Sequence, residues 1–213
     1  MNAHKEAPLR VGLTGGLASG KSTVAHRITE AGCLVLDADR LVADLYRPGE
    51  PGALAVRELF GPSSLDSTGA VDHRAVAARV FADEEARHAL ERAIHPLVRR
   101  RFEEITGGQL PGAIVALEAT LLVEAGFGPG FDLVATVEAP AALRLARAIA
   151  RGLPEEGARA RLAAQGDGTP RRQGSHRILD NDRDLDRLER QIAAFLDDLR
   201  ALAQRSATAG HGS

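Results

Sequence analysis

Residues 9–30 read LRVGLTGGLASGKSTVAHRITE, and this stretch decides the fold. Leu9 to Thr14 is a short apolar run that predicts a β-strand. Lys21 to Glu30 has the periodicity of an α-helix, which we expect to end near Gly32. Between them, Gly15 to Gly20 predicts a glycine-rich turn. A strand, such a turn and a helix in this order indicate a phosphate-binding loop.

The turn and the first helical residues match the motif G-x-x-x-x-G-K-[ST]. Glycines let backbone N–H groups point at phosphate oxygens, and the helix N-terminus adds a partial positive charge. We expect Lys21 to reach the β- and γ-phosphates of ATP, and the Ser22 hydroxyl to ligate Mg²⁺. A turn that only connected a strand to a helix would not require Lys followed by Ser. The predicted phosphate-binding residues are Gly15, Gly16, Leu17, Ala18, Ser19, Gly20, Lys21, Ser22 and Thr23.

Four further apolar runs predict the other strands of one sheet, at residues 33–36, 113–117, 133–137 and 178–179. Helical stretches separate these runs, which is typical of a parallel sheet covered by helices on both faces. We therefore predict an α/β protein with a P-loop three-layer α/β/α fold, built on a five-stranded parallel sheet. The inserted helical lobe and the lid described next complete this expected fold.

The expected domain organisation has three parts. The nucleotide-binding core comprises residues 9–39, 112–140 and 177–203. Residues 40–111 show no convincing strand and have helical periodicity interrupted at His95-Pro96, which predicts an inserted helical lobe. Residues 141–176 are rich in arginine and glycine, which predicts a segment that is mobile unless an anion orders it; the family resemblance given below implies that this segment is a lid. We expect flexible tails at the two ends, residues 1–8 and 204–213.

Composition narrows the class of protein. The chain has 213 residues, 44% of them apolar, and a formal net charge of −2, so it can bury a core but carries no general field that would hold nucleic acid. A single cysteine, Cys33, excludes an internal disulfide framework and suits a reducing compartment. The sequence contains no run of about 18 apolar residues, so no membrane span is predicted. We expect a cytoplasmic protein that binds neither membrane nor nucleic acid.

Three acids follow predicted strands and are candidates for the chemistry. Asp37 and Asp39 come just after the second strand, at the sheet edge where ligands bind in parallel α/β proteins. Asp39 can serve as a general base for an attacking hydroxyl or as the N-cap of the next helix, and the residues favour neither role. Glu118 can hold a Mg²⁺-bound water or be an ordinary helix-start carboxylate.

Arginines of the predicted lid are candidates for contacts with the phosphates. Arg147 and Arg151 are four residues apart and share a helix face, and Arg144 lies on the neighbouring surface. Arginines that close over a transferred phosphoryl group lower the barrier electrostatically. An arginine-rich solvated helix is the alternative for any one of them.

Several motifs in order resemble those of the dephospho-CoA kinase family over nearly the whole chain. The phosphate loop is shared by many kinases, but the other motifs are narrower. They are Asp37-Ala38-Asp39, Pro48-Gly49, Phe60-Gly61, His95-Pro96-Leu97, Leu121-Leu122-Val123-Glu124, Ala163-Ala164-Gln165 and Asp180-Asn181. The resemblance implies a transferase that uses ATP and Mg²⁺ to phosphorylate the ribose 3′-hydroxyl of dephospho-CoA, the last step of coenzyme A synthesis.

The resemblance also implies roles for residues of this chain, and we expect a monomer. The helical lobe would bind the acceptor, and the lid would close over ATP. The implied catalytic residues are Asp39 as general base, with Lys21 and Arg147. The implied acceptor-binding residues are Asp39, Arg74, His95, Leu121 and Glu124. Lid and nucleotide contacts would come from Arg147, Arg151 and Asn181, and metal contacts from Ser22 and Glu118, the latter directly or through water.

Three positions depart from the family pattern. The chain has Glu118-Ala119-Thr120 where the family usually has Asp-x-Pro, and His176 where the family usually has Asp before the last strand. The alternative functions are a regulatory nucleotide hydrolase, a kinase for another small acceptor such as a nucleoside, a sugar or shikimate, and a non-catalytic nucleotide-binding module. The hydrolase would need Lys within Asn181-Asp182-Arg183-Asp184 and Asp-x-x-Gly after the third strand, which the chain lacks.

Overall fold

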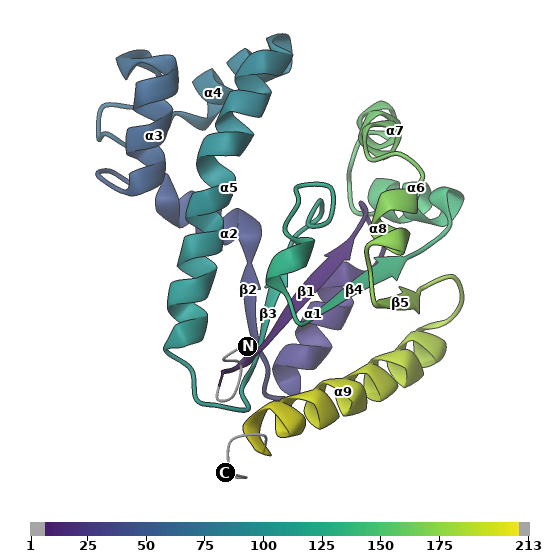
Figure 1. The fold of residues 1–213 in the computed structure, drawn as a ribbon. Helices are drawn as coiled ribbons and strands as arrows, with labels where there is room; N and C mark the ends of the chain where they lie inside the picture. Colours follow the sequence, from purple (N-terminus) through teal and green to yellow (C-terminus); the bar gives the residue numbers. More distant parts are fainter. Residues whose placement is uncertain (1–6, 209–213) are drawn as a thin grey trace. The chain divides into compact units, whose positions relative to one another are not determined.

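The structure is a computed structural model and describes residues 7–208 (Figure 1). The chain divides into two compact units. One unit combines the residues up to Leu36 with those from Thr106 onward, and the other is Asp37–Ile105. Within the described residues, no helix is both long enough and apolar enough to cross a membrane. The predicted division into core, lobe and lid stays a prediction.

The nucleotide unit is built on a five-stranded sheet, and the predicted P-loop α/β/α fold is confirmed. The strand order is β2-β3-β1-β4-β5, and β1 pairs in parallel with both β3 and β4. The strands are β1 Leu9–Gly15, β2 Leu34–Asp37, β3 Ile114–Glu118, β4 Leu133–Glu138 and β5 Arg177–Asp180. Each lies within two residues of its predicted range, because short apolar runs between turns define buried strands well.

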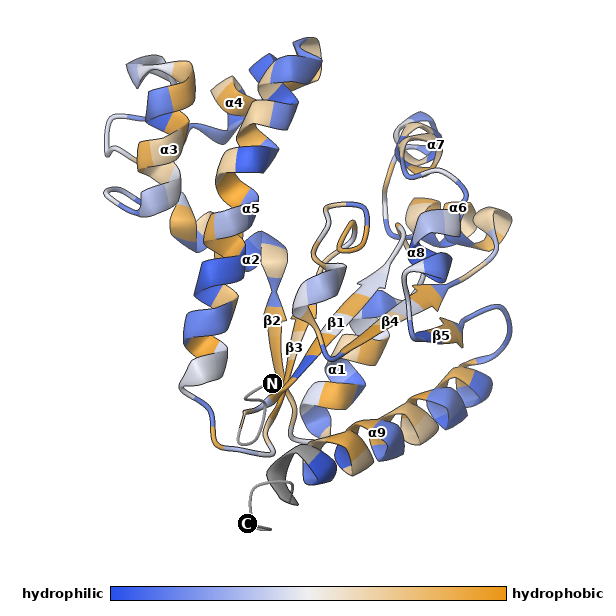
Figure 2. Cartoon of the chain, viewed as in Figure 1, coloured by the Kyte–Doolittle hydropathy of each residue, from blue (hydrophilic) through white to orange (hydrophobic). Residues whose placement is uncertain are grey.

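Two helices cover the core of this unit. Helix α1 (Lys21–Glu30) contacts β1 and β4, and helix α9 (Leu185–Thr208) contacts α1, β1, β3 and β5. The apolar stripe of α9 is visible in Figure 2, and its buried members include Leu188, Ile192 and Phe195. Cys33 is buried in the same core, and burial raises the pKa of its thiol. Helix α9 ends five residues beyond residue 203, which is the expected end of the nucleotide-binding core.

The expected lid is helical in this structure. Its helices are α6 (Ala141–Ala150), α7 (Glu155–Ala164) and the short α8 (Thr169–Gln173). Glycines separate them: Gly152 lies between α6 and α7, and Gly166 and Gly168 lie between α7 and α8, all with positive φ. The glycines therefore mark turns between helices.

The second unit is helical, as expected. Its helices are α2 (Ala38–Leu45), α3 (Pro51–Phe60), α4 (His73–Ala82) and α5 (Glu84–Gly107), the last of which ends in the other unit. The predicted interruption at His95-Pro96 is wrong, because α5 continues through Pro96. Proline removes only one helical N–H, and long helices tolerate this when the flanking turns are held by packing. Ile94 and Val98 are buried on either side of Pro96.

Candidate functional site

The phosphate loop connects β1 to α1 as the motif predicts. Gly20 is the N-cap of α1 with φ 105, a left-handed conformation that favours glycine. A Cβ at position 20 would also collide with the Nδ2 atom of Asn181. Ala18 has φ 55, which is uncommon for a residue other than glycine and is typical of strained functional loops. The Ser19 hydroxyl is buried and has no hydrogen-bond partner within the described chain.

Lys21 forms an ion pair with Glu118. Lys21 is the first residue of α1, and Glu118 is the last residue of β3, which lies beside Leu13 of β1. The Lys21 Nζ atom is 2.5 Å from Oε1 of Glu118, and the two side chains are 16% and 15% exposed. The predicted phosphate-binding lysine and the predicted metal-site acid are thus brought together. The cause is the parallel register of β1 and β3, which places both residues at the same sheet edge.

Asn181 joins three parts of the nucleotide unit. It follows β5, its Nδ2 atom donates to the Ser19 carbonyl at 2.8 Å, and its own backbone N–H donates to the Glu138 carbonyl. Arg147 of α6 donates to Asn181 twice, from Nη1 to the backbone oxygen and from Nη2 to Oδ1, each at 3.2 Å. Arg147 and Asn181, both predicted to serve the nucleotide, therefore lie together beside the phosphate loop. Arg151 caps the end of α6 and is exposed.

Arg144 lies closer to the loop than the arginines favoured from the sequence. Its Nε atom donates to the Leu17 carbonyl at 2.9 Å, and its Nη2 atom donates to Oε1 of Gln165 at 2.8 Å. The same Gln165 oxygen accepts the Leu17 N–H at 2.8 Å. Burial, and then the nearby charge of Arg171, lower the pKa of Arg144, while Glu138 opposes the shift. The sequence indicated Arg144 only as a neighbour of Arg147 and gave Gln165 no role.

A buried ion-pair cluster lies at the ends of β3 and β4, and the sequence did not reveal it. Arg171 of α8 is fully buried, with Nη1 3.0 Å from Glu124 and Nε 3.4 Å from Glu138. The Thr136 hydroxyl also donates to Glu138, at 2.7 Å. Glu124, predicted to bind the acceptor, thus uses one carboxylate oxygen to hold the expected lid. Leu121, the other predicted acceptor residue in this loop, is half exposed.

In the helical unit the two candidate aspartates separate. The Asp37 carboxylate accepts the backbone N–H groups of Asp39 and Arg40, so Asp37 is the N-cap of α2. The Asp39 side chain is exposed and forms no hydrogen bond or ion pair with any residue in the described part of the chain. The alternative role of Asp39, capping the helix, is therefore taken by Asp37.

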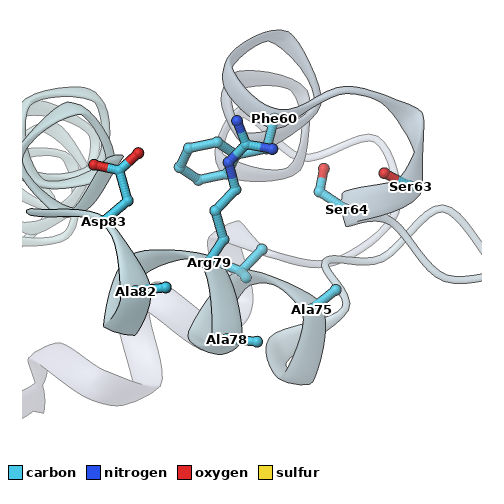
Figure 3. Close-up of a pocket in the computed structure, with 9 residues that line it drawn as sticks. Phe60, Ser63, Ser64, Ala75, Ala78, Arg79, Ala82 and Asp83 are labelled. Atoms are coloured by element: carbon cyan, nitrogen blue, oxygen red, sulfur yellow. The ribbon is translucent and has the colours of Figure 1, made fainter. Parts of the chain in front are cut away.

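Two other predicted acceptor residues of the helical unit, Arg74 and His95, do not line the pocket that the structure shows between α3 and α4. Figure 3 shows a pocket of about 480 Å³ between α3 and α4, where the Arg79 guanidinium lies 5.2 Å from the centre of the Phe60 ring. Neither Arg74 nor His95 lines it. Arg74 is exposed at the start of α4. Burial lowers the pKa of His95, with Arg99 acting in the same direction and Glu91 against it.

Two of the three departures from the family pattern, Thr120 and His176, form hydrogen bonds to strands of the sheet. Thr120, in place of the usual proline, offers its carbonyl oxygen to the Thr14 hydroxyl at 3.0 Å. His176 pairs with Val134 through both its backbone and its ring, since Nδ1 accepts the Val134 N–H at 2.9 Å. Thr120 thus contacts β1 near its carboxyl end, and His176 contacts β4 near its start, by hydrogen bonds that the sequence could not specify.

Comparison with known proteins agrees with this geometry. The family model described as dephospho-CoA kinase matches residues 9–187. A dephospho-CoA kinase of Frankia casuarinae is 40% identical, over 93% of this chain and 87% of the relative, and one of Streptomyces avermitilis is 38% identical, over 90% and 94%. The Thermus thermophilus protein TT1252 has a solved structure that matches with a TM-score of 0.75 and 37% identity, over 91% of this chain and 98% of that one.

A shikimate kinase of Bacteroides thetaiotaomicron matches with a TM-score of 0.53 and 12% identity, over 90% of this chain and 98% of that one, which indicates a common fold. The family model, which matches residues 9–187, and the relatives at 38–40% identity are more specific. The chain belongs to the dephospho-CoA kinase family.

Proposed function

We propose that the chain catalyses the reaction of its family, the ATP-dependent phosphorylation of the ribose 3′-hydroxyl of dephospho-CoA to give coenzyme A. The observation that carries the proposal is the phosphate loop with Lys21 and Glu118 facing each other at its edge. Loop amides, a helix N-terminus and a lysine together form a site for the phosphates of a nucleotide.

Lys21 has the leading electrostatic role. In this structure its ammonium group forms an ion pair with the Glu118 carboxylate. The β- and γ-phosphates of ATP carry more negative charge than one carboxylate, so they compete for Lys21 and release Glu118. Lys21 then stabilises the charge of the transferred group, without exchanging a proton.

The residues at the loop fit Mg²⁺. In kinase sites Mg²⁺ takes one or two protein ligands and completes its shell with phosphate oxygens and water. Ser22 is exposed in the first turn of α1, and Glu118 supplies a carboxylate at the end of β3. No group of three metal-ligating side chains occurs among residues 7–208, and this chemistry does not need one. Held there by Ser22 and Glu118, the ion would supply positive charge that offsets the charge of the phosphates.

Asp39 is the proposed general base, and the helical unit is the proposed acceptor lobe. Because Asp37 caps α2, the Asp39 carboxylate is free to accept the proton of the 3′-hydroxyl. Arg74, His95, Leu121 and Glu124 are the proposed acceptor contacts, and Arg147, Arg151 and Asn181 the proposed nucleotide contacts. A monomeric state and a cytoplasmic location complete the proposal.

An acceptor panel tests the function. ADP release is measured by a coupled assay with dephospho-CoA, adenosine, shikimate or gluconate as the acceptor, and with no acceptor. We expect dephospho-CoA alone to raise the rate above the acceptor-free background. Equal or faster turnover with another acceptor would indicate a kinase for a different small molecule. A rate of ADP release that is the same with and without every acceptor would indicate a nucleotide hydrolase.

A further inference from the structure

Arg144 is a buried cation without a carboxylate partner. Its residue is 4% exposed, and within the described chain no Asp or Glu lies within ion-pair distance of its guanidinium. Its hydrogen bonds go to two neutral oxygens, the Leu17 carbonyl and Oε1 of Gln165. A buried charge is costly unless a counter-charge offsets it, so this position favours the arrival of an anion.

The guanidinium is held against the phosphate loop. A Cβ at Gly16 would collide with Nη2 and Cζ of Arg144, so only glycine allows this approach. The bond from Nε to the Leu17 carbonyl fixes the plane of the group. A pocket of about 360 Å³ borders Arg144, Gly166 and Asp167 and gives access to this region.

The Gln165 side-chain oxygen occupies the point where two donors converge. The Leu17 N–H and Nη2 of Arg144 both donate to Oε1 of Gln165, each at 2.8 Å. One donor is a phosphate-loop amide and the other a cation, which is the arrangement that binds phosphoryl oxygens and other oxyanions. A neutral carboxamide oxygen is a weaker acceptor than a phosphate oxygen for this pair.

We propose that Arg144 is a catalytic arginine that, with the Leu17 N–H, binds an oxygen of the phosphoryl group transferred from ATP, and that the Gln165 carboxamide holds this position until ATP displaces it. The inference rests on the proposed function. In the transfer, the bond from the γ-phosphorus to the β-γ bridging oxygen breaks, and a bond from the γ-phosphorus to the acceptor oxygen forms. ADP leaves with the electron pair, the acceptor proton goes to the general base, and Arg144 stays protonated.

Arg147 has a different position. Both of its terminal nitrogens donate to Asn181, which in turn holds the Ser19 carbonyl. Arg147 is thereby placed to shape the loop from the β5 side, while Arg144 contacts the loop at Leu17 directly. Arg144 is therefore the arginine whose hydrogen bond to a protein oxygen, Oε1 of Gln165, is replaced by one to a phosphate oxygen when ATP binds.

Nucleotide binding tests the proposal without any acceptor. Titration calorimetry with Mg²⁺ compares the affinities of the full-length parent, Arg144→Gln and Arg144→Lys for ATP and for ADP. We expect Arg144→Gln to weaken ATP about tenfold or more and ADP by less than about threefold, because only ATP carries the γ-phosphate. Arg159→Gln is the matched control, since Arg159 is an exposed arginine of α7 paired with Glu155, and we expect it to match the parent.

The proposal would be overturned if Arg144→Gln lowered the affinities for ATP and for ADP equally, or lowered neither of them. If Arg144→Gln does not fold, Arg144→Lys decides, because lysine keeps the charge but lacks the planar fork. It should lose part of the preference for ATP over ADP, and an unchanged preference contradicts the role. Gln165→Ala removes the competing acceptor, so ATP should bind at least as tightly as in the parent. The proposal would also be overturned if Gln165→Ala lost as much affinity for ATP as Arg144→Gln does.

Turnover distinguishes this proposal from the proposed function. With dephospho-CoA as acceptor, Arg144→Gln should lower kcat about 10²–10³-fold, as removal of a donor to a developing oxyanion does. If the parent phosphorylates no dephospho-CoA but Arg144→Gln still loses its preference for ATP, the function fails and the arginine assignment stands. If the parent is active and Arg144→Gln retains its kcat, the assignment fails and the function stands.

Discussion

The nucleotide unit and the helical unit use their polar side chains differently. In the nucleotide unit, hydrogen bonds join residues far apart in sequence, such as Leu17 with Gln165, Lys21 with Glu118, and Ser19 with Asn181. In the helical unit they are mostly local: Asp37 and Asp72 cap helices, and Arg87 pairs with Glu84 and Glu91 within α5. Arg101 with Glu50 is a longer-range exception.

This difference indicates where function is concentrated. A long-range network costs conformational freedom and fixes donors in one geometry, which catalysis of phosphoryl transfer requires. Local caps and surface pairs mainly support helices, and each contributes little. Substitutions in the long-range network of the nucleotide unit should therefore reduce the rate or the stability strongly, whereas substitutions in the helical unit should do so only where a residue takes part in the chemistry.

The largest effect is expected for Lys21→Ala. Loss of the charge at the β- and γ-phosphates should lower turnover with dephospho-CoA by about 10³-fold or more, since no water can replace it in the closed site. Steady-state kinetics measures this. Arg87→Ala in the helical unit is the control, and it should leave turnover within about twofold, because exposed helix pairs contribute only about 0.2–0.5 kcal/mol. Turnover of Lys21→Ala within about tenfold of the parent contradicts the role.

Asp39→Asn tests the proposed general base, which belongs to the helical unit. We expect at least about a hundredfold loss of kcat with little change in ATP affinity, because asparagine cannot accept the acceptor proton. Asp37→Asn is the matched control: asparagine caps helices as well as aspartate does, so fold and rate should both persist. If Asp39→Asn turns over like the parent, Asp39 is not the base.

Substitutions in the two units should also differ in their effect on the free energy of unfolding. Arg171→Met leaves Glu138 buried and unpaired, so the free energy of unfolding should fall by about 3–5 kcal/mol. Urea denaturation measures this, with Arg87→Ala again as the surface control. An Arg171→Met protein that loses less than about 1 kcal/mol would show that the buried cluster does not hold α8 to the sheet.

The smallest effect concerns His95. Its pKa in the folded state is lowered by burial, so the unfolded chain takes up a proton at a higher pH than the folded chain. The contribution is fully present above the ordinary histidine pKa, near 6.5, and is lost as pH falls below it toward the folded-state pKa. Unfolding measured from pH 7.5 to 5 should show a steeper loss of stability for the parent than for His95→Gln. Identical pH profiles would contradict the shift.

The sequence predicted those features that depend on local pattern. The glycine-rich loop, helix α1 at Lys21–Glu30 and the five strands follow from the spacing of glycine and apolar residues. The continuation of helix α5 through Pro96 could not be predicted in this way, because tertiary packing outweighed the local penalty of proline.

Pairings across the sheet were beyond the sequence. Glu118 was found as an acid at a strand end, but its pairing with Lys21 depends on the register of β3 against β1. Arg171 meets Glu124 and Glu138 across 47 and 33 residues, and no local pattern encodes such a contact. Arg144 was one of several arginines in a helix until its contact with Leu17 distinguished it.

Direct identification of the product tests the central claim, that the phosphate loop of this chain transfers a phosphoryl group to dephospho-CoA. The full-length protein is incubated with ATP, Mg²⁺ and dephospho-CoA, and the products are analysed by ³¹P NMR and mass spectrometry. The account predicts equal amounts of ADP and of coenzyme A with a phosphomonoester on the ribose 3′-carbon, and formation of that product about 10³-fold or more slowly with Lys21→Ala. ADP without phosphorylated acceptor, or a phosphate at another position of dephospho-CoA, would contradict it.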